Sequence, residues 1–185
     1  NNIYSGFDLS NEMLNVARSR SNLINYFEGN AEKKFPFENN SQDLAYLVDV
    51  IHHIVDLNVF FNECKRILVP EGKLIIVTDS EENFSKRGLM KYFPEILDIE
   101  RLRYPSIEIL IDNAKEAGFE HKGSYLSEGT ILIDDNFISN LEQKSSSATR
   151  LIDDEAHMRG IERMKASKGD DWISSYTVVL FERLT

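Results

Sequence analysis

Several features that would assign this sequence to particular classes of protein are scarce or absent. It has a single cysteine, Cys64, in 185 residues. No internal disulfide can form, and a reducing compartment is expected. No apolar run approaches the roughly 20 residues that span a bilayer. The first residues lack the basic and apolar regions of a secretory signal. We therefore expect a cytoplasmic protein with no membrane partner.

Positive charge is also in short supply. The chain has 21 Lys and Arg residues against 31 Asp and Glu, a formal net charge of -10. Such a chain repels a phosphate backbone unless it carries a local basic patch. The densest basic cluster is only Lys86-Arg87, with Lys91 nearby. We expect no nucleic-acid partner.

The regular pattern that is present begins with two apolar runs around an amphipathic helix. Residues 44–50 are apolar except for Asp49, and residues 74–77 form a second apolar run. Between them, apolar residues from Leu57 to Leu68 recur at helical spacing, with Asp56 as a capping residue. This strand–helix–strand order predicts a parallel sheet covered on both faces.

The rest of the chain extends the same fold class. Short strands are expected at residues 3–7 and 25–29, helices over most of 136–167, and a final antiparallel strand at 176–181. The sequence therefore predicts one domain, 1–185, with a doubly wound α/β fold and a mostly parallel sheet. Residues 81–104 lack a clean period, and we interpret them as an insertion of short helices.

Four segments, in order and at the right spacing, resemble the small-molecule, methyltransferase-11-like branch of the class I S-adenosylmethionine (SAM)-dependent methyltransferases. They lie within residues 3–78, and beyond them only the architecture matches. The segments are 6–14 (GFDLSNEML), 27–31 (FEGNA) with 35–37 (FPF), 41–54 (SQDLAYLVDVIHHI) and 61–73 (FNECKRILVPEGK).

The resemblance implies SAM as the cofactor, and Asp8 is its main candidate ligand. A carboxylate can accept both hydroxyls of a ribose, and Asp8 ends a strand, where α/β folds bind ligands. The alternative is that Asp8 only caps the following helix. The other positions carried over from the family are Leu9 and Met13 beside the adenine, Asn30 and Ala31 near its amino group, and Leu47 and Val48 beside the methionine part. Ordinary core packing for Met13 and a simple turn at Asn30 remain open.

His52 and His53 are the candidate catalytic residues. An imidazole changes charge near neutral pH and can act as a general base. Packing or ordering of the loop is the alternative role for this pair. Neighbouring helical side chains point about 100° apart, which makes the pair poor joint metal ligands, and no supporting ligands stand at a convincing spacing. No metal is expected.

The insertion at 81–104 is the candidate lid over a small-molecule methyl acceptor. Its aromatic residues Tyr92, Phe93 and Tyr104 would line the acceptor site, or else form a separate packing cluster. The identity of the acceptor, the need for a base and the oligomeric state cannot be predicted from the sequence.

One departure from the family concerns the first strand and its glycine-rich loop, which would precede Ile3. We expect the chain to be N-terminally truncated, with bare strand edges at 3–7 and 44–50 and poor cofactor binding and activity on its own. Two alternatives to an active methyltransferase stay open. They are a nicotinamide-dependent oxidoreductase, whose ribose also binds an acidic residue after the second strand, and a non-catalytic binding module with a degenerate methyltransferase fold.

Overall fold

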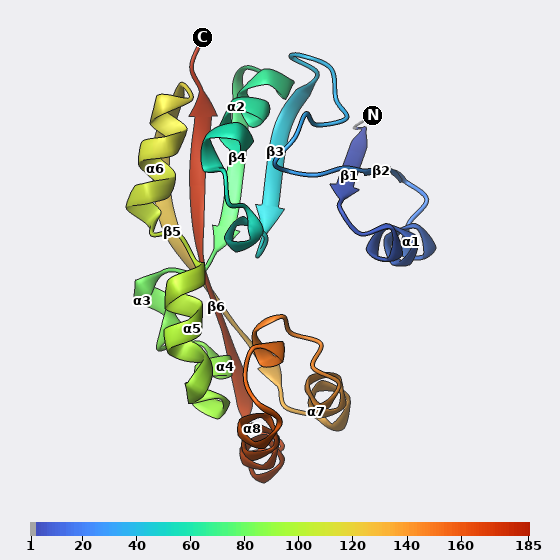
Figure 1. The fold of residues 1–185 in the computed structure, drawn as a ribbon, viewed down its shortest axis with the longest axis vertical. Coiled ribbons are helices and arrows are strands. Elements are labelled where there is room, and N and C mark those ends of the chain that lie inside the picture. Colours follow the sequence, from blue (N-terminus) through green and yellow to red (C-terminus); the bar gives the residue numbers. More distant parts are fainter. Residues whose placement is uncertain (1–2) are drawn as a thin grey trace.

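The computed structural model describes residues 3–185, in which two sheets are flanked by helices (Figure 1). The strands are β1 (Tyr4–Asp8), β2 (Ile24–Glu28), β3 (Gln42–Val48), β4 (Leu68–Thr78), β5 (Phe119–Leu132) and β6 (Asp171–Arg183). The α-helices are α1 (Asn11–Arg20), α2 (Leu57–Ile67), α3 (Glu81–Phe84), α4 (Gly88–Tyr92), α5 (Leu97–Arg103), α6 (Ile107–Glu116), α7 (Asp135–Glu142) and α8 (Asp154–Ala166). Three 3-10 turns complete them: η1 (Ile51–His53), η2 (Pro94–Ile96) and η3 (Ala148–Arg150).

The central strand–helix–strand unit is confirmed. The side chain of Asp56 accepts a hydrogen bond from the backbone N–H of Val59 at 3.0 Å and so caps α2. The apolar face of α2 is buried, as its periodicity predicts; its buried residues are Phe60, Phe61, Cys64 and Ile67. The helix is followed directly by β4, which pairs in parallel with β3.

β1 and β2 form a parallel pair, and a second sheet has the order β3-β4-β6-β5. In the second sheet β3, β4 and β5 run in one direction, because β3 pairs in parallel with β4 and because β6 is antiparallel to both β4 and β5. The sheet is therefore mixed, and the predicted antiparallel final strand is confirmed as β6. β5 is one strand of 14 residues, whereas the sequence favours two separate short strands at 123–126 and 130–133. Antiparallel strands tolerate one exposed face, and most β5 residues are exposed.

One face of the larger sheet carries the first hydrophobic cluster. α2 and α6 pack there on β4, β5 and β6. We name this cluster the sheet core; its buried members are Phe35, Ile51, Ile54, Phe60, Phe61, Cys64, Ile67, Leu68, Leu74, Ile76, Leu110, Ala114, Ala117, Phe119, Val179 and Phe181. On the other face of β3, the side chains of Leu44, Tyr46 and Val48 are exposed. β1 and β3 each pair with one strand only among the described residues.

A second hydrophobic cluster lies at the far end of the β5–β6 ribbon (Figure 1). The candidate lid, residues 81–104, shares it with α7, η3 and α8. We name it the lobe core; its buried members are Phe84, Leu89, Met90, Tyr92, Phe93, Ile96, Tyr104, Ile133, Ile138, Leu141, Ala148, Ile152, Ala156, Ile161 and Met164. The arrowheads of β1, β3 and β4 all point toward this lobe in Figure 1, so the carboxyl ends of these strands face it.

Candidate active site

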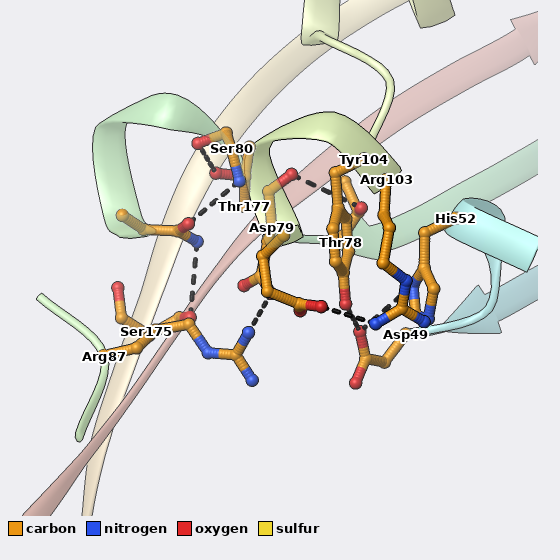
Figure 2. A network of polar contacts seen from close by, with 12 residues as sticks. Asp49, His52, Thr78, Asp79, Ser80, Arg87, Arg103, Tyr104, Ser175 and Thr177 are labelled. Atoms are coloured by element: carbon orange, nitrogen blue, oxygen red, sulfur yellow. Dashed lines mark hydrogen bonds and ion pairs between the residues drawn. The ribbon is translucent and has the colours of Figure 1, made fainter. Parts of the chain in front are cut away.

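A polar cluster occupies the junction between the carboxyl ends of the sheet and the lobe (Figure 2). Asp49 follows β3 and Asp79 follows β4, which are parallel neighbours. The backbone N–H of Asp49 still donates to the carbonyl of Val77 at 2.9 Å. Asp49 then adopts a left-handed conformation, with φ of 54°, which few residues other than glycine tolerate. This bend ends the strand, and Figure 2 shows the Asp49 carboxylate beside Tyr104 and His52.

Asp79 and Arg87 form a buried ion pair that joins the sheet to the lobe. The Asp79 side chain is fully buried, and its Oδ2 pairs with the guanidinium of Arg87, the residue that precedes α4. Burial raises the pKa of Asp79 to about 7, although the Arg87 charge acts in the opposite direction. The second oxygen, Oδ1, has no hydrogen-bond partner within residues 3–185.

His52 is packed tightly at the edge of this cluster. Its side chain is only 1% exposed, and its ring centroid lies 4.3 Å from that of Tyr104 and 4.0 Å from that of His53. Nδ1 is 3.7 Å from Oδ1 of Asp49, too far for a hydrogen bond, and neither ring nitrogen has a partner among the described residues. Burial, helped by the charge of His53, lowers the pKa of His52 to about 4. The ring is therefore neutral at pH 7.

Tyr104 brings the lid into contact with the end of β3. It follows α5, and its hydroxyl donates to Oδ1 of Asp49 at 2.5 Å. Burial and the nearby Asp49 carboxylate raise the pKa of Tyr104 above its ordinary value, so the phenol stays protonated. Nearby, the buried carboxylate of Glu100 pairs with Arg103.

A cavity of about 370 Å³ opens beside this cluster. Asp49 and Arg87 supply its charged lining, and Phe137, Trp172 and Tyr176 supply aromatic lining. The remaining lining residues are Leu89, Ile131, Leu141, Ser145, Ser146, Ser147 and Ser174. The cavity thus lies between the end of the sheet and the lobe, where α/β folds bind small ligands.

The residues predicted to hold the adenosine part of SAM gather around the end of β1. Asp8 accepts a hydrogen bond from the N–H of Ser10 through Oδ1 at 2.8 Å, so it does cap the turn into α1. Its other oxygen has no hydrogen bond within the part of the chain that the structure describes. Leu9 and Met13 are 69% and 58% exposed, which excludes core packing for Met13 among the described residues.

The other predicted cofactor residues have more restricted side chains. Oδ1 of Asn30 accepts a hydrogen bond from the backbone N–H of Glu32 at 2.7 Å, so Asn30 does form a turn. This bond leaves the side-chain amide nitrogen of Asn30 available. Ala31 and Leu47 pack against the sheet core, whereas Val48 is exposed on the opposite face of β3. The side chains of Leu47 and Val48 therefore point to opposite faces at the end of β3.

Of the three predicted lining residues, only Tyr104 reaches the polar cluster. Tyr92 is buried and stacks on Trp172, with ring centroids 5.8 Å apart and planes 7° apart. Phe93 is fully buried and stacks on His157. The structure places both in the lobe core, and neither lines the cavity.

Sequence reasoning missed several residues that form the cluster and the cavity. Asp49 was the one visible signal, as the single charged residue within an otherwise apolar run. Asp79 also ends an apolar strand, but Arg87, Phe137 and Trp172 come from distant segments with no shared motif. Their proximity follows only from the docking of the lobe.

Neither a metal cluster nor a membrane helix is found in the described part of the chain. Residues 3–185 contain no group of three or more His, Cys, Asp or Glu side chains placed to hold a metal ion. In the same range no helix is long and apolar enough to cross a bilayer.

Comparison with protein families identifies the N-terminal part of the chain. Residues 2–76 match the methyltransferase domain family. The match covers less than half of the chain, and it confirms that this segment resembles class I SAM-dependent methyltransferases. An uncharacterized protein of Methanocaldococcus jannaschii is 30% identical over 82 residues, which cover 43% of this chain and 36% of that protein. The match thus spans little more than a third of the relative's length.

Solved structures extend the similarity of fold to nearly the whole chain. A protein of Anabaena variabilis, described as a methyltransferase from an antibiotic biosynthesis pathway, superimposes with a TM-score of 0.66 at 17% identity, covering 97% of this chain and 81% of that one. A Thermotoga maritima protein, described as a SAM-dependent methyltransferase and possible histamine N-methyltransferase, gives 0.58 at 22% identity, covering 98% and 73%. At these identities the likeness establishes a methyltransferase-like α/β fold with a mixed sheet.

Proposed function

We propose that this chain carries the cofactor and acceptor sites of a methyltransferase that moves a methyl group from SAM to a small molecule. The observation that supports this most directly is that the candidate cofactor residue and the cavity lie at the same edge of the fold. Asp8 at the end of β1 and Asp49 at the end of β3 both lie where the carboxyl ends of strands face the lobe (Figure 1). A donor at the first position and an acceptor in the cavity would lie on the same side of the fold, and positioning the two reactants supplies much of the catalysis.

The side chains near Asp8 fit the adenosine part of SAM chemically. The uncommitted carboxylate oxygen of Asp8 can accept hydrogen bonds from ribose hydroxyls. The exposed side chains of Leu9 and Met13 offer an apolar surface for adenine, and the amide nitrogen of Asn30 can donate to a ring nitrogen. When bound, SAM supplies a methyl group activated by its positively charged sulfur.

The two histidines fit different roles in this proposal. The ring of His52 is buried and neutral between Asp49 and Tyr104, so it positions the Asp49 loop against the lid. His53 is an exposed residue, and it is the candidate base for an acceptor that must lose a proton. The methyltransferase family match favours methyl transfer over the nicotinamide-dependent alternative.

A titration of SAM into the 185-residue chain, followed by amide chemical shifts in two-dimensional NMR, tests the cofactor site even at weak affinity. We expect shifts at residues 8–9 and 30–31. Asp8→Ala should weaken binding by about 1.5–3 kcal/mol, the range for hydrogen bonds to a charged group. Asp43→Ala removes an exposed carboxylate at the start of β3 and is the matched control.

Equal SAM affinity in the wild type and Asp8→Ala would assign Asp8 to helix capping alone. Formation of S-adenosylhomocysteine with a panel of small acceptors tests the transfer itself. Binding of SAM without product from any acceptor would instead favour the non-catalytic binding module.

A further inference from the structure

The cavity beside Asp49 has the size of a small-ligand site. Its volume of about 370 Å³ lies in the lower part of the usual range for such pockets. Its lining comes from the end of β3, from the segment before α4, and from α7 and β6. It therefore exists only because the lobe is docked against the end of the sheet.

The charges at this cavity do not cancel. Arg87 lines it, but its guanidinium is already paired with the fully buried Asp79. Asp49 has no cationic partner: its Oδ1 accepts a hydrogen bond from the neutral phenol of Tyr104, and the nearby His52 ring is buried without a hydrogen bond. Within residues 3–185 the second carboxylate oxygen of Asp49 has no partner, and the side chain is 38% exposed. Among the described residues, Asp49 is thus the carboxylate in the cavity lining that has no Lys or Arg within ion-pair distance.

The neighbouring wall is aromatic. Phe137 and Trp172 pack edge to face with ring centroids 4.9 Å apart, and both line the cavity. Tyr176 lines it as well, with the Arg87 guanidinium 5.4 Å from its ring centroid. A cavity lined by an anionic group and by aromatic side chains suits an organic cation, which gains from charge at one end and from apolar contact at the other.

We propose that this cavity binds a small organic amine, held as its ammonium ion by the Asp49 carboxylate with its apolar part against Phe137 and Trp172. This inference rests on the proposed function, for which it names the acceptor class. A carboxylate ligand is disfavoured because the Arg87 guanidinium already contacts the Asp79 carboxylate, and because Asp49 would repel a second anion.

Three probes of one shape test the charge preference without SAM: 2-phenylethylamine, 2-phenylethanol and 3-phenylpropionate. Their dissociation constants for the 185-residue chain are measured by NMR titration at pH 7. We expect the amine to bind at least about tenfold more tightly than the other two, from an added charge-assisted hydrogen bond. Asp49→Asn should remove that advantage and leave the alcohol unchanged. Asp43→Asn, which neutralises an exposed carboxylate outside the cavity, should change neither.

Ser147→Lys is a second variant, at an exposed cavity residue that lies away from the Asp49 contacts. Its added positive charge should weaken amine binding and strengthen binding of 3-phenylpropionate. Equal affinity of the wild type for amine and alcohol, or tightest binding of the carboxylate, would overturn the proposal. Because these titrations contain no SAM, their failure is distinct from failure of SAM to bind near Asp8.

Discussion

The sheet core and the lobe core are both well packed, but they differ in how they are built. The sheet core rests on long regular elements, with the α2 face packed on β4 and β6. The lobe core combines the short helices of residues 81–104 with α7, η3 and the longer α8, which follow much later in the sequence, and Tyr92 and Phe93 are buried within it. The strand–helix–strand unit of the sheet core is contiguous and is revealed by the sequence pattern, whereas the lobe core depends on the docking of separate segments. The polar cluster and the cavity lie where the two meet.

The largest expected effect compares the two cores directly. Phe61→Ala in the sheet core and Phe93→Ala in the lobe core each empty a fully buried site, and each should cost about 3–5 kcal/mol of unfolding free energy. Urea unfolding followed by circular dichroism measures the cost. Amide hydrogen exchange then shows whether Phe93→Ala opens the lobe alone. A loss below about 1 kcal/mol for Phe93→Ala would show that the lobe is loosely packed, as expected of a mobile lid.

A second test breaks the ion pair between the two regions. Arg87→Met leaves the buried Asp79 carboxylate without its cation, which should cost about 3 kcal/mol at pH 8. The pKa of Asp79 is already raised to about 7 by burial, so its folded form favours the proton. The contribution of Asp79 to the free energy of unfolding is present at low pH, where the carboxyl is protonated, and is lost as pH rises through 7. This loss should be larger in Arg87→Met, which has no cation beside the ionised carboxylate. The cost should therefore be smaller at pH 5.5 than at pH 8.

Lys86→Met changes the neighbouring residue, whose cation lies 3.7 Å from an exposed carboxylate of Glu128, and serves as the matched control. It should cost little at either pH because exposed ion pairs contribute about 0–1 kcal/mol. A pH-independent cost of Arg87→Met would show that Asp79 does not titrate in this range.

The smallest of these effects concerns His52. Its folded-state pKa of about 4 lies below the ordinary value of 6.5, so the unfolded chain takes up the proton more readily. Stability from the neutral ring is complete above pH 6.5 and is lost as pH falls toward 4. At pH 5 the loss should be about 2 kcal/mol. His52→Phe should remove this component, so its stability relative to the wild type should rise between pH 7 and pH 5.

His53→Phe, at the exposed neighbouring position, should leave the pH dependence of the wild type largely in place. Parallel pH profiles of the wild type and His52→Phe would contradict the neutral, buried state of the His52 ring.

The sequence predicted the parts of the fold in which one element alone carries the signal. The periodicity of α2, the cap at Asp56 and the strong final strand were all visible along the chain and are confirmed. The order of the strands was not predicted, because it depends on which strands pair, and pairing is non-local. The single long β5 was also missed, since its exposed residues give a weak pattern.

The same distinction between local and non-local signals applies to the candidate site. Asp8 and Asn30 were found because short motifs carry them, although their function remains a prediction. His52 was found as part of a motif, but its burial and lowered pKa depend on Tyr104, which reaches it from the lid. Tyr92 and Phe93 are aromatic residues in the predicted lid, and no local pattern separates those that enter a core from those that face a ligand.

The sequence by itself determined the α/β class, the central strand–helix–strand unit and the resemblance of residues 3–78 to a methyltransferase. Those features depend on local periodicity and on residues close together in the chain. Only the tertiary structure decided that Asp49, Arg87 and Trp172 line one cavity and that Asp79 is paired while Asp49 is not. Burial and the cancellation of charge depend on partners contributed by distant segments, and a linear pattern does not specify them.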